Sequence, residues 1–121
     1  MANVLIVDDA AFMRMTIRKM LEANGHTVIG EAGTGIGGVN QYKALKPEVA
    51  LFDLTMPEMD GMSAIRQIKE YDPKARIIVC TALGQQTKIA EAIESGATDF
   101  IVKPFEVDRL LAAIEKVMKM K

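Results

Sequence analysis

The sequence has one cysteine and no tryptophan, and it has no long hydrophobic run. A single thiol, Cys80, cannot form an internal disulfide or build a cysteine-based metal site. The longest unbroken apolar run, Leu110–Ile114, is far shorter than the roughly 20 residues that a membrane-spanning helix needs. The first residues also lack the pattern of a secretory signal. We therefore expect a soluble, cytoplasmic protein.

The chain also lacks an excess of charge of either sign. Fifteen lysines and arginines against sixteen aspartates and glutamates give a formal net charge of −1. This balance offers no electrostatic footprint for nucleic acid or an anionic membrane, so we expect neither as a partner. What is present is a globular composition, with 50% hydrophobic and 26% charged residues in 121 residues. That length predicts a single domain covering residues 1–121.

Short β-rich apolar segments alternate with longer segments of helical spacing along the whole chain. Strands are expected at residues 4–7, 27–31, 49–52, 76–80 and 99–102, and helices at about 10–23, 39–45, 62–71, 86–95 and through 110–118. Strands that read as continuous apolar runs are buried on both faces, which is typical of a parallel sheet covered by helices. The predicted fold class is α/β, with a doubly wound, five-stranded parallel sheet of (βα)5 type.

Four of the expected strands end at polar residues that can bind phosphate or metal ions. Asp8 and Asp9 follow the first strand, and Asp53, Thr81 and Lys103 follow the third, fourth and fifth. Because the carboxyl ends of parallel strands lie along one edge of the sheet, we expect these side chains to meet in one pocket.

The expected pocket has more negative than positive charge. Asp8, Asp9 and Asp53 oppose the single ammonium of Lys103, and a hard divalent cation such as Mg²⁺ fits this deficit. An alternative is that Asp8 or Asp9 caps the first helix, but this accounts for only one of them. Asp53 alone is compatible with a metal ligand, a general base or a nucleophile. Transfer of a phosphoryl group to Asp53 is the chemistry that uses every member, since Thr81 and Lys103 then neutralise its oxygens.

The chain resembles the receiver domain of two-component response regulators, and within that family the single-domain regulators of chemotaxis. The matching segments follow the family order over the whole chain: Val7–Asp9, Asp53 with Met56–Gly61, Thr81–Ala82 and Asp99–Phe105. The resemblance implies the strand order 2-1-3-4-5. It also implies a phosphorylation-dependent signalling switch.

The resemblance further implies the roles of the acidic residues. Asp53 would accept a phosphoryl group from a histidine kinase, with the chemotaxis kinase as the leading donor. Asp9, Asp53 and the backbone carbonyl of Thr55 would bind Mg²⁺, and Asp8 would act mainly through water. The protein would catalyse its own phosphorylation and slow dephosphorylation, and would not be an enzyme in the usual sense.

In the same resemblance, Thr81 and Lys103 would bind the phosphoryl oxygens, and Phe100 would occupy the aromatic switch position. Movement of Thr81 and Phe100 would remodel the surface of the fourth helix, fifth strand and last helix for a partner. The expected partner is the flagellar switch protein, and a phosphatase is possible. The alternatives are a phosphorelay intermediate that passes phosphate to a histidine phosphotransfer domain and a phosphate-independent binding module.

Two other motifs compete with this interpretation. Gly33–Gly38 matches the dinucleotide fingerprint G-x-G-x-x-G, and Asp53 lies at the fingerprint's spacing. It follows the second strand, however, so we interpret the glycines as loosening the turn and weakening the second helix. A haloacid-dehalogenase-like phosphatase would also use an aspartate such as Asp53, but Pro57 breaks its pattern. His26 is interpreted as a solvated loop residue.

Overall fold

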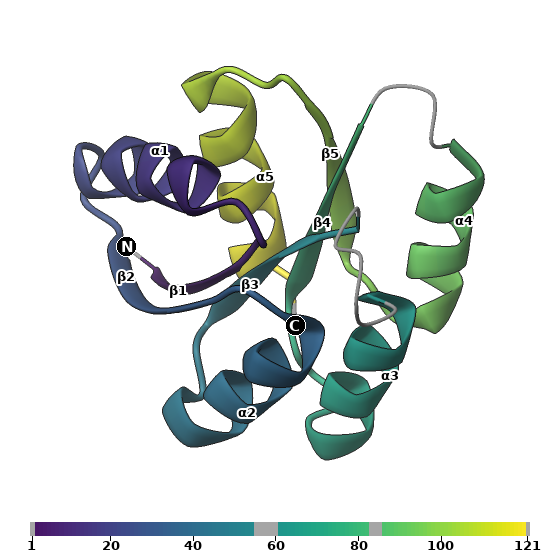
Figure 1. The fold of residues 1–121 in the computed structure, drawn as a ribbon. Helices are drawn as coiled ribbons and strands as arrows, with labels where there is room; N and C mark the ends of the chain where they lie inside the picture. Colours follow the sequence, from purple (N-terminus) through teal and green to yellow (C-terminus); the bar gives the residue numbers. More distant parts are fainter. Residues whose placement is uncertain (1, 55–60, 83–85, 121) are drawn as a thin grey trace.

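The computed structural model describes residues 2–54, 61–82 and 86–120 (Figure 1). Strands and helices alternate in the order β1 (Asn3–Val7), α1 (Ala11–Glu22), β2 (Thr27–Ala32), α2 (Gly35–Leu45), β3 (Val49–Asp53), α3 (Gly61–Tyr71), β4 (Ile77–Ala82), α4 (Gln86–Ser95), β5 (Asp99–Lys103) and α5 (Val107–Met118). Among the helices in these ranges, none has the length and apolar character needed to cross a membrane.

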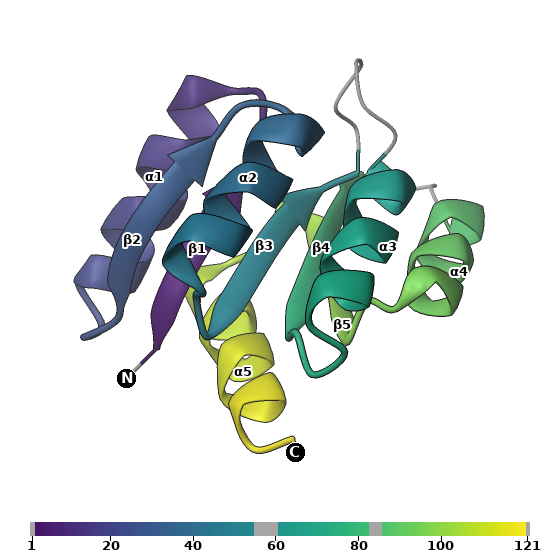
Figure 2. The same ribbon diagram turned by 90° about the horizontal axis from the view of Figure 1, so that it is seen from below.

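The strands form one parallel sheet in the order β2-β1-β3-β4-β5. Helices α1 and α5 cover one face of the sheet, and α2 and α3 cover the other (Figures 1 and 2). The predicted α/β class and the strand order implied by the resemblance are both confirmed.

The strand β3 shows why its sequence is an uninterrupted apolar run. All five of its residues are buried. Ala50 and Phe52 belong to the core cluster that includes side chains of α2 and α3, whereas Val49 and Leu51 belong to the cluster that includes side chains of α1 and α5. Alternate residues of a strand point to opposite faces, so a sheet covered on both sides needs apolar residues at every position.

The ends of several elements differ from the sequence-based expectations. The strands β3, β4 and β5 extend through Asp53, Thr81 and Lys103, so these residues lie within the ladder and not beyond it. The helix α1 is preceded by Ala10 as its N-cap, and no side chain makes a capping hydrogen bond there. Neither aspartate of the Asp8–Asp9 pair therefore caps this helix.

The helix α2 begins at Gly35, four residues before the expected start, and includes part of the glycine-rich segment. The Thr34 side chain accepts a hydrogen bond from the backbone N–H of Gly37 at 2.9 Å, which stabilises the first turn. Gly38 faces the sheet, where a Cβ atom would lie 2.9 Å from Cγ2 of Val7 and 3.0 Å from Cζ of Phe52. Glycine at this position thus allows close packing of α2 against the sheet, a role that helical periodicity does not reveal.

We expect Gly38→Val to destabilise the protein by between about 1 and 3 kcal/mol, because the added methyl groups overpack the contact with Val7 and Phe52. Urea unfolding followed by circular dichroism measures this change. Asn40→Val is the matched control, since it places the same β-branched residue at an exposed position of α2. Equal losses of stability in the two variants would mean that close packing is not the reason for Gly38.

His26 lies in the connection between α1 and β2 as expected, but it is only partly exposed, so its interpretation as a fully solvated side chain is wrong. Its Nδ1 atom accepts a hydrogen bond from the backbone N–H of Ala2 at 3.0 Å. Burial lowers the pKa of His26, which favours the neutral ring that this bond requires. The residue joins the start of β1 to the turn before β2.

Candidate functional site

Polar residues that are far apart in the sequence meet at the carboxyl edge of the sheet. Asp8 follows β1, Asp53 ends β3, Thr81 lies near the end of β4 and Lys103 ends β5. Asp8 and Asp53 are each 2% exposed, and Thr81 is fully buried. The predicted convergence is confirmed for Asp8, Asp9, Asp53 and Lys103, whereas Thr81 is shown only to end up buried at the same edge of the sheet.

Lys103 bridges the two buried carboxylates. Its Nζ atom lies 3.1 Å from Oδ2 of Asp8 and 3.4 Å from Oδ1 of Asp53. The contact with Asp8 joins residues 95 positions apart in the chain. The peptide bond between Lys103 and Pro104 is cis, which the sequence left open. One cation thus faces two carboxylates directly.

The pKa values of Asp8 and Lys103 reflect this crowding of charge. Burial raises the pKa of Asp8, and the charge of Asp53 adds to the effect, while hydrogen bonds from Ala10 and Lys103 oppose it. Burial acts to lower the pKa of Lys103, but the hydrogen bond with Asp8 and the charges of Asp53 and Asp8 raise it overall. The contact with Lys103 therefore does not fully offset the cost of burying the charged Asp8 carboxylate.

The acidic residues have the donor set of a site for a hard cation. Asp8, Asp9 and Asp53 each offer a carboxylate oxygen, and these atoms lie within 4.8 Å of one another. Asp9 is exposed, whereas the other two are buried. Carboxylate oxygens with an open, solvent-facing side suit Mg²⁺, which keeps several water ligands. Thr55, whose carbonyl was expected to join this set, lies outside the described residues.

Thr81 shows an unusual feature for a buried hydroxyl. Within the described ranges, its Oγ1 atom is buried and has no hydrogen-bond partner. Buried polar groups are almost always paired, because desolvation without a partner is costly. An oxygen from a group that the chain itself does not contain would satisfy this hydroxyl. The sequence suggested Thr81 by its place at a strand end, but not that its hydroxyl has no partner within the described ranges.

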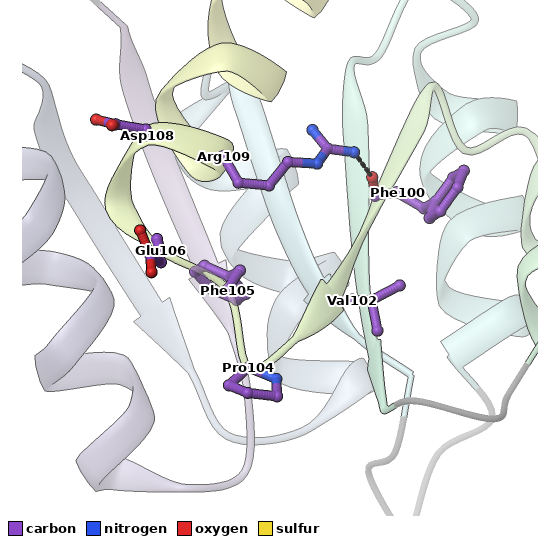
Figure 3. A pocket seen from close by; sticks show the side chains of 7 residues that line it. All are labelled: Phe100, Val102, Pro104, Phe105, Glu106, Asp108 and Arg109. Atoms are coloured by element: carbon purple, nitrogen blue, oxygen red, sulfur yellow. Dashed lines mark hydrogen bonds between the residues drawn. The ribbon is translucent and has the colours of Figure 1, made fainter.

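Phe100 links the site to a groove on the outer side of β5. The Phe100 carbonyl accepts a hydrogen bond of 2.8 Å from Nη2 of Arg109 in α5. Figure 3 shows the Phe100 ring pointing away from this guanidinium, and the half-buried ring packs against the core cluster of α2 and α3. The groove has a volume of about 470 Å³ and is lined by Phe100, Val102, Pro104, Phe105, Glu106, Asp108 and Arg109.

Sequence reasoning missed two arginines that contact this region. Arg109 holds the Phe100 carbonyl, and Arg14 donates through Nη1 to the backbone carbonyl of Asp8. Both of these contacts are made to backbone carbonyls, whose positions cannot be read from the sequence pattern. Only the spacing of Arg14, one helical turn beyond the acidic pair, hints that it can reach back toward Asp8.

The fold and the site agree with a known family. The model of the response regulator receiver domain matches residues 4–115, so this chain belongs to the response regulator receiver family. Similar proteins include the chemotaxis protein CheY of Bacillus subtilis, which is 53% identical over 116 residues and covers 96% of this chain and 97% of its own length. CheY of Thermotoga maritima is 53% identical over 117 residues, with 97% of this chain and 98% of that protein covered.

A solved structure that contains CheY is also similar to this chain. The CheX–CheY–BeF3–Mg²⁺ complex of Borrelia burgdorferi contains a chain that matches with a TM-score of 0.89 and 34% identity, over 95% of this chain and 87% of that chain. This chain is thus a phosphorylation-dependent response regulator of the chemotaxis type. The dinucleotide-binding and phosphatase alternatives receive no support from these matches.

Proposed function

We propose that Asp53 is the phosphoryl acceptor of this receiver domain. The observation that supports it most directly is the buried Asp53 carboxylate, with the Lys103 ammonium 3.4 Å away and two further carboxylates within 4.8 Å. This arrangement places a nucleophilic carboxylate beside an ammonium group and beside carboxylates that can bind a metal cation. Phosphoryl transfer requires such positive charge to neutralise the phosphoryl oxygens. The family match covers residues 4–115, and we expect residues 1–121 to act as one such domain.

In the proposed reaction, an oxygen of Asp53 attacks the phosphorus of a phosphohistidine on a kinase. A bond forms between this oxygen and phosphorus, the phosphorus–nitrogen bond breaks, and the imidazole leaves with the electron pair. The Lys103 ammonium would neutralise one phosphoryl oxygen, and the Thr81 hydroxyl would donate a hydrogen bond to another. Attack by water on the acyl phosphate would return Asp53 and inorganic phosphate. By these two steps, the chain would accept a phosphoryl group and would promote both its own phosphorylation and its own dephosphorylation.

Mg²⁺ is the cofactor that we propose for this site. Asp9 and Asp53 would hold it with the Thr55 carbonyl, and Asp8 would act mainly through water. When bound, Mg²⁺ supplies positive charge that offsets the carboxylates and the phosphoryl oxygens. The Borrelia burgdorferi relative, whose structure contains Mg²⁺, supports this choice.

Thr81 and Phe100 form the proposed switch. In the parallel ladder, Phe100 is opposite Val79 and Val102 is opposite Thr81. Because residues two apart on a strand share a face, Thr81 and Phe100 lie on the same face of neighbouring strands. Engagement of the Thr81 hydroxyl by a phosphoryl oxygen would free space that the Phe100 ring can enter. Phe100 also lines the groove beside α5, so this movement would change the outer surface.

The proposed partners follow from the family and the relatives. A histidine kinase of the chemotaxis system would supply the phosphoryl group, and the flagellar switch protein would bind the altered surface of α4, β5 and α5. A phosphatase is a further candidate partner, and the solved complex of CheY with CheX supports binding of other proteins to such a domain.

The test is to incubate the protein with acetyl phosphate and Mg²⁺, and to compare it with a sample that contains a chelator. We expect a hydroxylamine-labile phosphoryl adduct only in the presence of Mg²⁺, and peptide mapping that assigns it to Asp53. An adduct on a different residue, or no adduct at all, would contradict the proposal. Offering the labelled protein a flagellar switch protein and a histidine phosphotransfer domain then separates chemotaxis from a phosphorelay.

A further inference from the structure

Arg14 connects the start of α1 to the backbone of the acidic pair. Its Nη1 atom donates to the backbone carbonyl of Asp8 at 2.5 Å, and its Nε atom donates to Oε1 of Glu31 at 3.0 Å. The side chain is only 21% exposed, which is low for an arginine on a surface helix. The guanidinium therefore lies between α1, the end of β1 and the end of β2.

The ion pairs around Arg14 anchor it without leaving a net charge beside the site. Glu31 also accepts from Nε of Arg18 at 2.8 Å and lies 2.6 Å from its Nη2, and Arg18 pairs with Glu22 at 3.1 Å. Two arginines thus face two glutamates. Because these charges balance, Arg14 acts on the acidic pair mainly through the position of its hydrogen bond and only weakly through long-range electrostatics.

The bond from Arg14 completes the hydrogen bonding of Asp8. The Asp8 backbone N–H donates to the carbonyl of Ala32 at 3.0 Å. One side-chain oxygen accepts from the N–H of Ala10 at 2.9 Å, and the other accepts from Lys103 at 3.1 Å. With the carbonyl held by Arg14, all four polar groups of Asp8 have partners, which come from β2, β5 and the α1 region.

The carbonyl of Asp8 belongs to the peptide unit that joins Asp8 to Asp9. Its direction sets the ψ angle of Asp8 and therefore the direction in which the chain leaves toward Asp9. Asp9 is exposed, so packing does little to hold its carboxylate. The hydrogen bond from Arg14 is thus a restraint on where Asp9 lies relative to the two buried carboxylates.

We propose that Arg14 is a positioning residue for the cation site, which orients the Asp8–Asp9 peptide through the Asp8 carbonyl while Glu31 holds its guanidinium in place. This inference rests on the proposed function, since it concerns the same three carboxylates. A guanidinium suits the role because its fixed fork donates in two directions at once. Groups that orient metal ligands from outside the coordination sphere typically contribute 10- to 100-fold to metal affinity.

The test compares Arg14→Met with Arg18→Met. Both variants remove an arginine that pairs with Glu31 from the same helix, but only Arg14 contacts Asp8. We expect Arg14→Met to raise the dissociation constant for Mg²⁺, measured by titration calorimetry, about tenfold. Arg18→Met should leave it within about twofold of the wild type, although its unfolding midpoint in urea falls to a similar extent.

A second variant and a second measurement keep the outcome decisive. Arg14→Lys preserves the charge but not the fork, and we expect it to bind Mg²⁺ with an affinity between those of the wild type and Arg14→Met. We also measure phosphorylation of Arg14→Met by acetyl phosphate at increasing Mg²⁺ concentration. For this variant, the Mg²⁺ concentration that gives the half-maximal rate should rise, while the rate at saturating Mg²⁺ should stay within about twofold of the wild type. If Arg14→Met does not fold, Arg14→Lys and Arg18→Met decide the question.

Equal Mg²⁺ affinity in the Arg14 and Arg18 variants would overturn the positioning role and leave the proposed function intact. Failure of the wild-type protein to bind Mg²⁺ would instead overturn the cation site itself, together with the role of Arg14. Retained affinity in Arg14→Lys but not in Arg14→Met would show that charge, and not the fork, is what Asp8 and Asp9 need, which also contradicts the inference.

Discussion

Asp53→Asn is expected to abolish formation of the hydroxylamine-labile phosphoryl adduct with acetyl phosphate and Mg²⁺. The amide has nearly the shape of the carboxylate, so the buried site stays filled, but its oxygen is a poor nucleophile and cannot form a stable acyl phosphate. The same change removes one of the three carboxylates whose oxygens lie within 4.8 Å of one another. We therefore also expect weaker binding of Mg²⁺.

The matched control for this prediction is Asp72→Asn, which makes the same chemical change at a distant position. Asp72 accepts hydrogen bonds from the Tyr42 hydroxyl at 2.9 Å and from the Lys74 backbone N–H at 3.1 Å. In asparagine the amide oxygen can accept from Lys74, and the amide NH2 group can donate to the Tyr42 oxygen. This variant should be labelled as the wild type is. Labelling of Asp53→Asn at the wild-type level would mean that another residue accepts the phosphoryl group. Circular dichroism spectra that match the wild type would show that both variants fold.

Lys103→Met is expected to destabilise the Mg²⁺-free protein by about 3 kcal/mol at pH 7, because it leaves two buried carboxylates without their cation. Asp8 and Asp53 have side chains that are 3% and 2% exposed, so water cannot replace the ammonium easily. The folded state raises the pKa of Lys103 above its ordinary value. Its contribution is therefore fully present below that ordinary value and is lost only as the pH rises through the folded-state pKa. Urea unfolding at pH 7 thus measures the whole effect.

Mg²⁺ should restore much of the stability lost in Lys103→Met, since a bound cation offsets the same carboxylates. The difference in unfolding free energy with and without Mg²⁺ should therefore be larger in the variant than in the wild type. Lys116→Met is the control: Lys116 lies 3.6 Å from Asp99, but its side chain is 66% exposed. We expect that variant to lose less than about 1 kcal/mol and to show no extra response to Mg²⁺. Similar losses in the two lysine variants would contradict the importance of the Lys103 contacts.

The sequence predicted the alternation of strands and helices well, because hydrophobic period is a local property. It was less accurate at the start of α2, where the glycines have poor helix propensity and yet belong to the helix. There a side-chain cap from Thr34 and the close approach of Gly38 to Val7 outweigh propensity. The sequence also missed the hydrogen bond of His26 with Ala2, since it joins two segments that come together only in the fold.

By itself, the sequence determined which chemistry this protein has available: carboxylates, a hydroxyl and an ammonium, each at the end of an apolar strand. Only the tertiary structure decided how these groups relate to one another. Lys103 reaches both Asp8 and Asp53, and the Thr81 hydroxyl is left without a partner among the described residues. The Arg14 guanidinium donates a hydrogen bond to the backbone carbonyl of Asp8. The physical reason is that residue types and the spacing of hydrophobic residues are local properties of the sequence. The distances between side chains at the strand ends depend instead on strand order, register and side-chain direction, which exist only once the sheet has formed.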